Sequence, residues 1–210
     1  MVVVAESWRS ESGESVLDPL AAAGYHVESL PFAAMATRRR RPRHDGVVPP
    51  DGTWELAICS RLPVTAVGSL PLGHVPRDPA GPRHALAVTV RADDRDLGIV
   101  GLHASSRVHF GGSLAHLLHL RRALDRGAWS ADVVAGDFNL WGPPVVTVMR
   151  GWRRAVRGRT YPAHRPHSQI DHVLVRATTV VLDAAVQPAT PSDHRPVRVR
   201  LRPGPRPVSG

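Results

Sequence analysis

A short apolar run at residues 133–135 ends in the tetrapeptide Gly-Asp-Phe-Asn at 136–139, and this junction constrains the fold more than any other feature. A valine-rich run that stops at a glycine is typical of a buried strand followed by a tight turn. Ile-Asp-His at 170–172 and Ser-Asp-His at 192–194 also stand beside apolar segments. We therefore expect carboxylate, amide and imidazole groups to meet at strand ends, which favours a site for a metal ion and a phosphate group.

The hydrophobic pattern predicts one mixed α/β domain built in layers, because strand-like runs alternate with stretches of helical spacing. Residues 34–53, with an arginine-rich run, and residues 68–82, rich in glycine and proline, are expected to be loops. The predicted helices are 15–23, 112–126 and 145–152, and the predicted strands are 2–5, 25–30, 54–60, 85–90, 97–102, 133–136, 169–176 and 197–201.

The length of 210 residues fits one domain at 1–202, followed by a proline- and glycine-rich tail at 203–210 that we expect to be flexible. No apolar stretch approaches the roughly 18 residues of a membrane span. The first residues lack the basic and long apolar regions of a signal peptide. A cytoplasmic location is the default expectation, with an export signal lost together with a missing N-terminus as the open alternative. The single cysteine, Cys59, excludes an internal disulfide and is expected to be a buried thiol.

The formal net charge of +9 is compatible with a polyanionic partner such as nucleic acid. However, the chain contains no lysine, so all its basic residues are arginine, and it is rich in alanine, valine, glycine and proline. That composition is typical of a GC-rich genome. The charge by itself therefore does not indicate a nucleic-acid-binding protein.

Hydrolysis of a phosphodiester requires neutralised phosphoryl charge, an oriented water that loses a proton, and a proton or metal contact for the leaving oxygen. Taken singly, an Asp after a strand is commonly a turn residue, and a lone His is commonly structural. The ordered set favours a catalytic site instead, because it combines carboxylates for a hard cation with an amide and two imidazoles. The set is Glu6, His103, Asp137, Asn139, Asp171, Asp193 and His194.

These segments resemble the endonuclease/exonuclease/phosphatase superfamily, which includes DNase I, the apurinic-site endonucleases, neutral sphingomyelinases and inositol polyphosphate 5-phosphatases. The Gly-Asp-Phe-Asn and Ser-Asp-His elements are the most specific parts of the resemblance. It implies an α/β four-layer sandwich of the DNase I-like kind, with two β-sheets packed face to face and helices outside each. The matching segments are 2–6, 57–63, 101–103, 136–139, 169–173 and 192–196.

The resemblance also implies roles for the carboxylates and the amide. Glu6 would hold Mg²⁺ or Mn²⁺, with Asp193 nearby, directly or through water. Asp137 would orient and deprotonate the attacking water, and Asn139 would contact the phosphate.

Two imidazoles complete the implied site. His194, paired with Asp171, would stabilise the pentacovalent charge or transfer a proton. His103 would be the second imidazole, as in the DNase-like branch, with Glu55 as a loosely matching carboxylate partner.

One part of the family pattern has no counterpart in the sequence. Family members place a further strand, ending in an Asn that touches the phosphate or orders the metal site, upstream of the metal-binding Glu. Because Glu6 stands almost at the start, we expect an N-terminally shortened fold, with a gene start further upstream as the open alternative. A truly shortened fold would have an exposed sheet edge and a weaker site.

The leading interpretation is a metal-dependent hydrolase of phosphodiester or phosphomonoester bonds. A nuclease is favoured because its substrate is abundant and polyanionic, and a small-molecule or lipid phosphodiesterase is the close alternative. A truncated, catalytically impaired remnant is a second alternative. A histidine-rich metal carrier is disfavoured, since only His116 and His119 share a helix face.

Overall fold

The computed structural model describes residues 1–35, 51–76, 78, 80–106, 111–202 and 204. Most of the predicted loop at 34–53, and all of the predicted flexible tail except Gly204, lie outside these residues. The described strands form a six-stranded sheet, a three-stranded sheet and a two-stranded ribbon.

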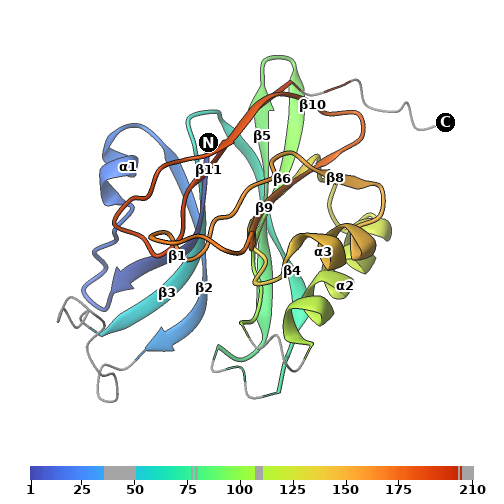
Figure 1. Ribbon diagram of the computed structural model, residues 1–210. Coiled ribbons are helices and arrows are strands. Elements are labelled where there is room, and N and C mark those ends of the chain that lie inside the picture. The colour runs from blue at the N-terminus through green and yellow to red at the C-terminus, as the bar shows by residue number, and fades with distance from the viewer. Residues whose placement is uncertain (36–50, 77, 79, 107–110, 203, 205–210) are drawn as a thin grey trace.

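The six-stranded sheet has the order β4-β5-β6-β7-β9-β8 (Figure 1). Its central pair, β6 and β7, is parallel, and the other pairs are antiparallel. A parallel pair requires a crossover connection, which contains helix α2 (Gly112–Asp125), so the carboxyl ends of both strands reach the same edge. The strands are β4 (Val64–Gly73), β5 (Arg83–Ala92), β6 (Arg95–His103), β7 (Val133–Asp137), β8 (Trp152–Arg154) and β9 (Asp171–Arg176).

A second β-layer packs against one face of this sheet. It consists of the three-stranded sheet β1-β3-β2, in which β1 is an edge strand, and of the antiparallel ribbon β10-β11. Leu56 and Ile58 of β3 are buried in one core with Val88 and Ile99 of the large sheet. The strands are β1 (Val2–Ser10), β2 (His26–Met35), β3 (Gly52–Ser60), β10 (Val180–Val186) and β11 (Val197–Arg202).

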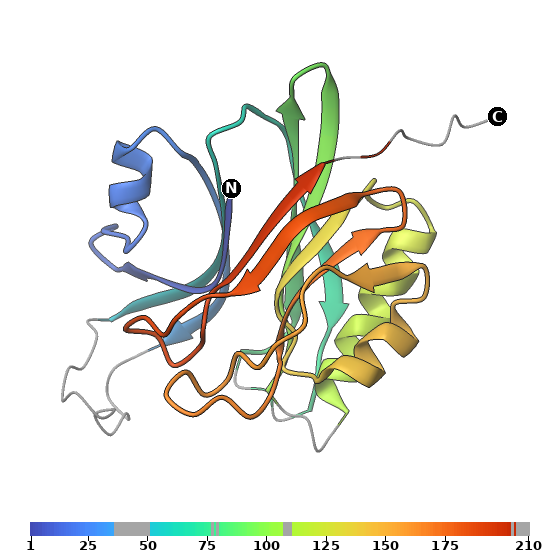
Figure 2. The same ribbon diagram turned by 45° about the horizontal axis from the view of Figure 1, so that its top comes forward.

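Helices cover the outer faces of both layers (Figure 2). Leu117 and Leu120 of α2 share a core with Leu102 and Val134, and α3 (Gly142–Val148) packs beside α2. The short helix α1 (Asp18–Ala22) and its flank cover the three-stranded sheet around the buried Cys59. The predicted four-layer α/β sandwich is therefore confirmed.

The prediction of a loop at 68–82 was wrong for residues 68–73, which belong to β4. Gly68, Pro71 and Gly73 break the apolar pattern, but β4 is an edge strand, where a proline costs no ladder bond on its open side. The pairing with β5 absorbs Pro71 and Gly73 at an irregularity in the register. Burial of Leu70 and Leu72 in the core that α2 completes stabilises the strand.

The predicted helix at 145–152 is also displaced. Helix α3 begins at Gly142, with prolines in its first positions, where a missing N–H leaves no hydrogen bond unmade. It ends at Val148, and Trp152 already belongs to β8. Strand β10 was not predicted from the sequence.

Candidate active site

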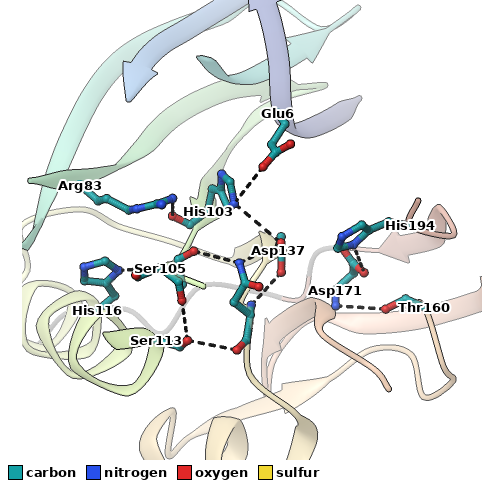
Figure 3. Close-up of polar contacts among 12 residues, drawn as sticks. Glu6, Arg83, His103, Ser105, Ser113, His116, Asp137, Thr160, Asp171 and His194 are labelled. Atoms are coloured by element: carbon teal, nitrogen blue, oxygen red, sulfur yellow. Dashed lines mark hydrogen bonds and ion pairs between the residues drawn. The ribbon is translucent and has the colours of Figure 1, made fainter. Parts of the chain in front are cut away.

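Three of the predicted site residues lie in one row across the six-stranded sheet (Figure 3). His103 and Asp137 are the last residues of β6 and β7 and are register partners. On the other side Asp137 pairs with Asp171, the first residue of β9. Asp171 therefore stands at the start of a strand, within the predicted strand 169–176, and antiparallel pairing brings it to the same edge.

The turn after Asp137 fixes the position of the Asp137 carboxylate. A Cβ at Gly136 would collide with the carbonyl oxygen of Leu102, so no larger residue fits there. Asn139 has a left-handed backbone with φ of 46°, which lets its backbone N–H donate to Asp137 Oδ1 at 2.7 Å. The Asn139 side chain donates to Asp137 Oδ2 at 3.1 Å and to the carbonyl of Ala104 at 3.0 Å. Asn139 therefore fixes both oxygens of Asp137.

The carboxyl group of Asp137 is nearly buried, and its pKa is strongly perturbed. Burial raises the pKa of Asp137 to about 7, and the negative charges of Asp171 and Glu6 add to the rise, against an opposing hydrogen bond from Asn139. A buried carboxylate that repels two neighbours is typical of a functional site.

Glu6 lies inside β1 rather than at the predicted strand end. The register between β1 and β3 shifts between Val4 and Ser7, and this irregularity carries Glu6. Its Oε1 is 3.6 Å from Nε2 of His103, and its side chain is 50% exposed. Glu6 is thus an accessible carboxylate over the row of strand ends (Figure 3).

His103 is buried between these carboxylates as a neutral imidazole. Its Nε2 is 3.8 Å from Oδ2 of Asp137. Burial lowers the pKa of His103 to about 3, with further lowering by the positive charges of Arg83 and His194. The suggested partnership with Glu55 is wrong, because Glu55 accepts a hydrogen bond from Nε of Arg9 at 2.9 Å.

His194 and Asp171 form the predicted pair. Nδ1 of His194 lies 2.9 Å from Oδ2 and 3.1 Å from Oδ1 of Asp171. Burial alone would lower the pKa of His194, but the hydrogen bond and charge of Asp171 outweigh it and raise the pKa to about 9. His194 is therefore an imidazolium at neutral pH.

Asp193 precedes His194 in a bend rather than at a strand end, and its backbone oxygen accepts a hydrogen bond from Ala163. Within the described part of the chain, no three His, Cys, Asp or Glu side chains converge as a metal-binding group. Glu6 and Asp193 are therefore not part of a three-residue group of this kind among the described residues.

The sequence did not single out two residues that contact the His194–Asp171 pair. Oγ1 of Thr160 accepts the backbone N–H groups of Ile170 and Asp171, each at 3.3 Å. The ring centroid of Tyr161 lies 4.8 Å from that of His194. Neither residue has a local pattern that could have revealed it, because both contacts join segments distant in sequence.

No helix among the described residues has the length and apolar character to cross a membrane.

Comparison with known proteins assigns the chain to a family. The model of the Endonuclease/Exonuclease/phosphatase family matches residues 2–194. No curated protein matches the chain.

Solved structures share the fold of this chain. An endonuclease/exonuclease/phosphatase from Beutenbergia cavernae has a TM-score of 0.70 at 24% identity, covering 99% of this chain and 64% of that chain. A mannosyl-6-phosphatase from Bacteroides thetaiotaomicron has a TM-score of 0.62 at 16% identity, covering 85% and 77%. A 3' phosphatase from Neisseria bound to a product DNA hairpin has a TM-score of 0.59 at 16% identity, covering 95% and 88%.

Proposed function

This chain belongs to the endonuclease/exonuclease/phosphatase family of phosphoric ester hydrolases, and we propose that it is a metal-dependent phosphodiesterase with nucleic acid as its favoured substrate. The observation that carries the proposal is the row of His103, Asp137 and Asp171 at one sheet edge, flanked by Glu6 and His194. It supports the proposal because a buried carboxylate, an imidazolium and an accessible carboxylate lie at the same edge of the sheet.

Glu6 and Asp193 are the proposed ligands of Mg²⁺ or Mn²⁺. Mg²⁺ typically takes one or two protein carboxylates and keeps several waters, so these two side chains would be sufficient protein ligands for such an ion. Burial is the main cause of the raised pKa of Asp137, and repulsion from Asp171 and Glu6 adds to it. That repulsion is a second point of fit, because a cation beside Glu6 would relieve it. When bound, the ion would supply positive charge to the phosphoryl oxygens.

Asp137 is the proposed base. Its pKa near 7 lets it accept a proton from water at neutral pH, and Asn139 holds both its oxygens in place. Both side-chain N–H bonds of Asn139 are already used, on Asp137 and on the Ala104 carbonyl. A phosphate contact by this amide would therefore require one of these bonds to be given up, which favours orientation of Asp137 as its main role.

His194 is the proposed source of positive charge opposite the base. With Asp171 as its partner it is charged at neutral pH, so it can stabilise a phosphoryl oxygen or donate a proton to the leaving oxygen. His103, being neutral, can exchange hydrogen bonds with water beside Glu6 and Asp137.

A polyanionic substrate is supported by the segment that leads to this site. Residues 138–170 contain six arginines and no acidic residue. Arg157, Arg159 and Arg165 in this segment are exposed, so their charges are available to a second phosphate group. A phosphomonoester or a small phosphodiester would not need them.

Hydrolysis of bis(p-nitrophenyl) phosphate tests the proposal. We expect turnover with Mg²⁺ or Mn²⁺, loss of turnover with EDTA, and loss of about a hundredfold or more in Asp137→Asn, where the base is removed. Asp94→Asn, an exposed carboxylate in the turn between β5 and β6, is the matched control and should keep its activity.

To identify the substrate class, kcat/KM is compared for three further substrates: single-stranded DNA, double-stranded DNA and p-nitrophenyl phosphate. A higher kcat/KM for either DNA supports the nuclease, whereas a higher value for the monoester would favour a phosphatase. Folded protein without turnover on any substrate would favour the impaired remnant.

A further inference from the structure

The His194–Asp171 pair contacts a hairpin at residues 160–168, to which the proposed mechanism assigns no role. The hairpin is closed by hydrogen bonds between its two arms, from the N–H groups of Thr160 and Tyr161 to the carbonyl of Ser168 and from the N–H of Ser168 to the carbonyl of Tyr161. The arms therefore form a short ladder that ends immediately before Asp171.

This hairpin is tied to the loop that carries His194. The N–H of Arg195 donates to the carbonyl of Thr160 at 2.8 Å, and the N–H of Ala163 donates to the carbonyl of Asp193 at 2.7 Å. Nε of Arg195 donates to the carbonyl of Ala163 at 2.8 Å. Three hydrogen bonds thus hold the residues on either side of His194 against one arm of the hairpin.

Thr160 joins the same arm to Asp171. Its side chain is fully buried, and its hydroxyl oxygen accepts the N–H groups of Ile170 and Asp171 (Figure 3). The carbonyl of Ile170 in turn accepts the N–H of Phe138, next to Asp137. Thr160 therefore bonds directly to the backbone of Ile170, Asp171 and Arg195, and Ile170 connects it to the residue after the base.

Tyr161 is the next residue and supplies the only ring that packs on His194 among the described residues. The two ring centroids are 4.8 Å apart with the planes tilted by 48°. Asp171 already holds Nδ1 of His194, so the motion left to the imidazole is rotation about that hydrogen bond. A ring in contact with one face of the imidazole removes it.

We propose that Tyr161 is a positioning residue of this enzyme, whose ring fixes the plane of the His194 imidazole while Thr160 anchors the hairpin that carries it. The inference rests on the proposed function for its kinetic consequence and on geometry alone for the contact. A hairpin tied at three points places Tyr161 rigidly, so the Nε2 edge of His194 is aimed at one position.

The test compares Tyr161→Leu and Tyr161→Phe with Tyr25→Leu. Tyr25 is the other tyrosine of the chain; it is also half-buried and lies under the guanidinium of Arg61, near the α1 core. On bis(p-nitrophenyl) phosphate with Mn²⁺, Tyr161→Leu should lower kcat by roughly ten- to a hundredfold with little change in KM, because a misaligned catalytic group loses rate steeply. Tyr161→Phe should keep kcat within about threefold, since the ring is retained, and Tyr25→Leu should keep kcat while losing comparable thermal stability.

A second readout does not need activity. The ring proton resonances of His194 in an NMR spectrum should move in Tyr161→Leu, stay in place in Tyr161→Phe, and stay in place in Tyr25→Leu. Equal kcat in Tyr161→Leu and Tyr25→Leu would overturn the proposal, and so would a Tyr161→Phe variant as impaired as Tyr161→Leu, which would assign the effect to the hydroxyl group. If the unaltered protein has no turnover, the proposed function fails, and the NMR comparison still decides whether Tyr161 holds His194.

Discussion

His103 and Asp137 are register partners, the last residues of two adjacent parallel strands. Cross-strand partners present their side chains on the same face of a sheet, so the strand register makes the imidazole and the carboxylate neighbours. Asp171 joins the row because β9 begins where β7 ends. The proposed site is therefore as rigid as the centre of the largest sheet.

The first prediction concerns the partner of His194. Asp171→Asn removes the carboxylate that keeps this imidazole charged, and Asn offers one neutral acceptor oxygen in place of two charged ones. We expect kcat for bis(p-nitrophenyl) phosphate to fall by about a hundredfold or more. Asp183→Asn, an exposed carboxylate paired with Arg198 on the ribbon, should have no effect, and equal rates in the two variants would remove His194–Asp171 from the mechanism.

The second prediction concerns the metal. Glu6→Gln keeps the size of the side chain and removes its charge, so the affinity for Mn²⁺ should fall by about tenfold or more. Titration calorimetry measures this directly, with exposed Glu11→Gln as the control. An unchanged affinity in Glu6→Gln would show that the ion is held elsewhere.

The third prediction concerns a buried ion pair behind the site. Asp78 and Arg83 are both buried, joined by bonds of 2.9 and 3.1 Å, and Arg83 also donates to the carbonyl of His103 at 3.2 Å. Burial alone would raise the pKa of Asp78, but the bonds from Arg83 and Ser105 outweigh it and lower the pKa to about 2. Arg83→Met leaves this carboxylate without its cation, so we expect a loss of about 3 kcal/mol in the free energy of unfolding.

Urea unfolding at pH 7 measures that loss. The control is Arg91→Met, which breaks the largely exposed pair of Arg91 and Asp96 and should cost less than about 1 kcal/mol. Similar losses in the two variants would contradict a structural role for the buried pair.

The fourth prediction concerns pH and stability. His116 of α2 is fully buried, and burial first, then the charge of Arg83, lowers its pKa to about 4. Because the folded pKa lies below the ordinary value of about 6.5, the stabilisation is complete above pH 6.5 and is lost as the pH falls toward 4. Because the pKa of His116 is lower in the folded protein, acidification from pH 7.5 to pH 5 should reduce the free energy of unfolding by about 1 to 2 kcal/mol.

His116→Asn tests this with its control on the same helix. Nδ1 of His116 accepts the N–H of Ser105 at 3.1 Å, and the Asn oxygen can take over this bond without titrating. The variant should lose less stability on acidification than the unaltered protein, whereas exposed His119→Asn should not differ from it. The opposite order would exclude His116 as the titrating group.

The features that could be predicted from the sequence are those encoded over a few neighbouring residues. The Gly-Asp-Phe-Asn turn is one, because glycine at 136 and the Asp137–Asn139 bonds are local. Glu6 lies beside His103, as its inclusion in the predicted site requires, but its place in the strand was predicted wrongly. The apolar run stops at residue 5, while pairing with β3 extends the strand to Ser10. Thr160 and Tyr161 were missed because their partners lie ten or more residues away along the chain, in segments that only the folded sheet brings together.

The turn between β5 and β6 has a practical consequence. Asp93 and Asp94 form it at the end of β6 opposite His103, and both are exposed. Since β6 has nine residues at about 3.3 Å each, an affinity tag inserted there would sit roughly 25 to 30 Å from the strand ends. Protein immobilised through this turn would present its reactive edge to the solution, so that long oligonucleotides could reach it without obstruction by the support.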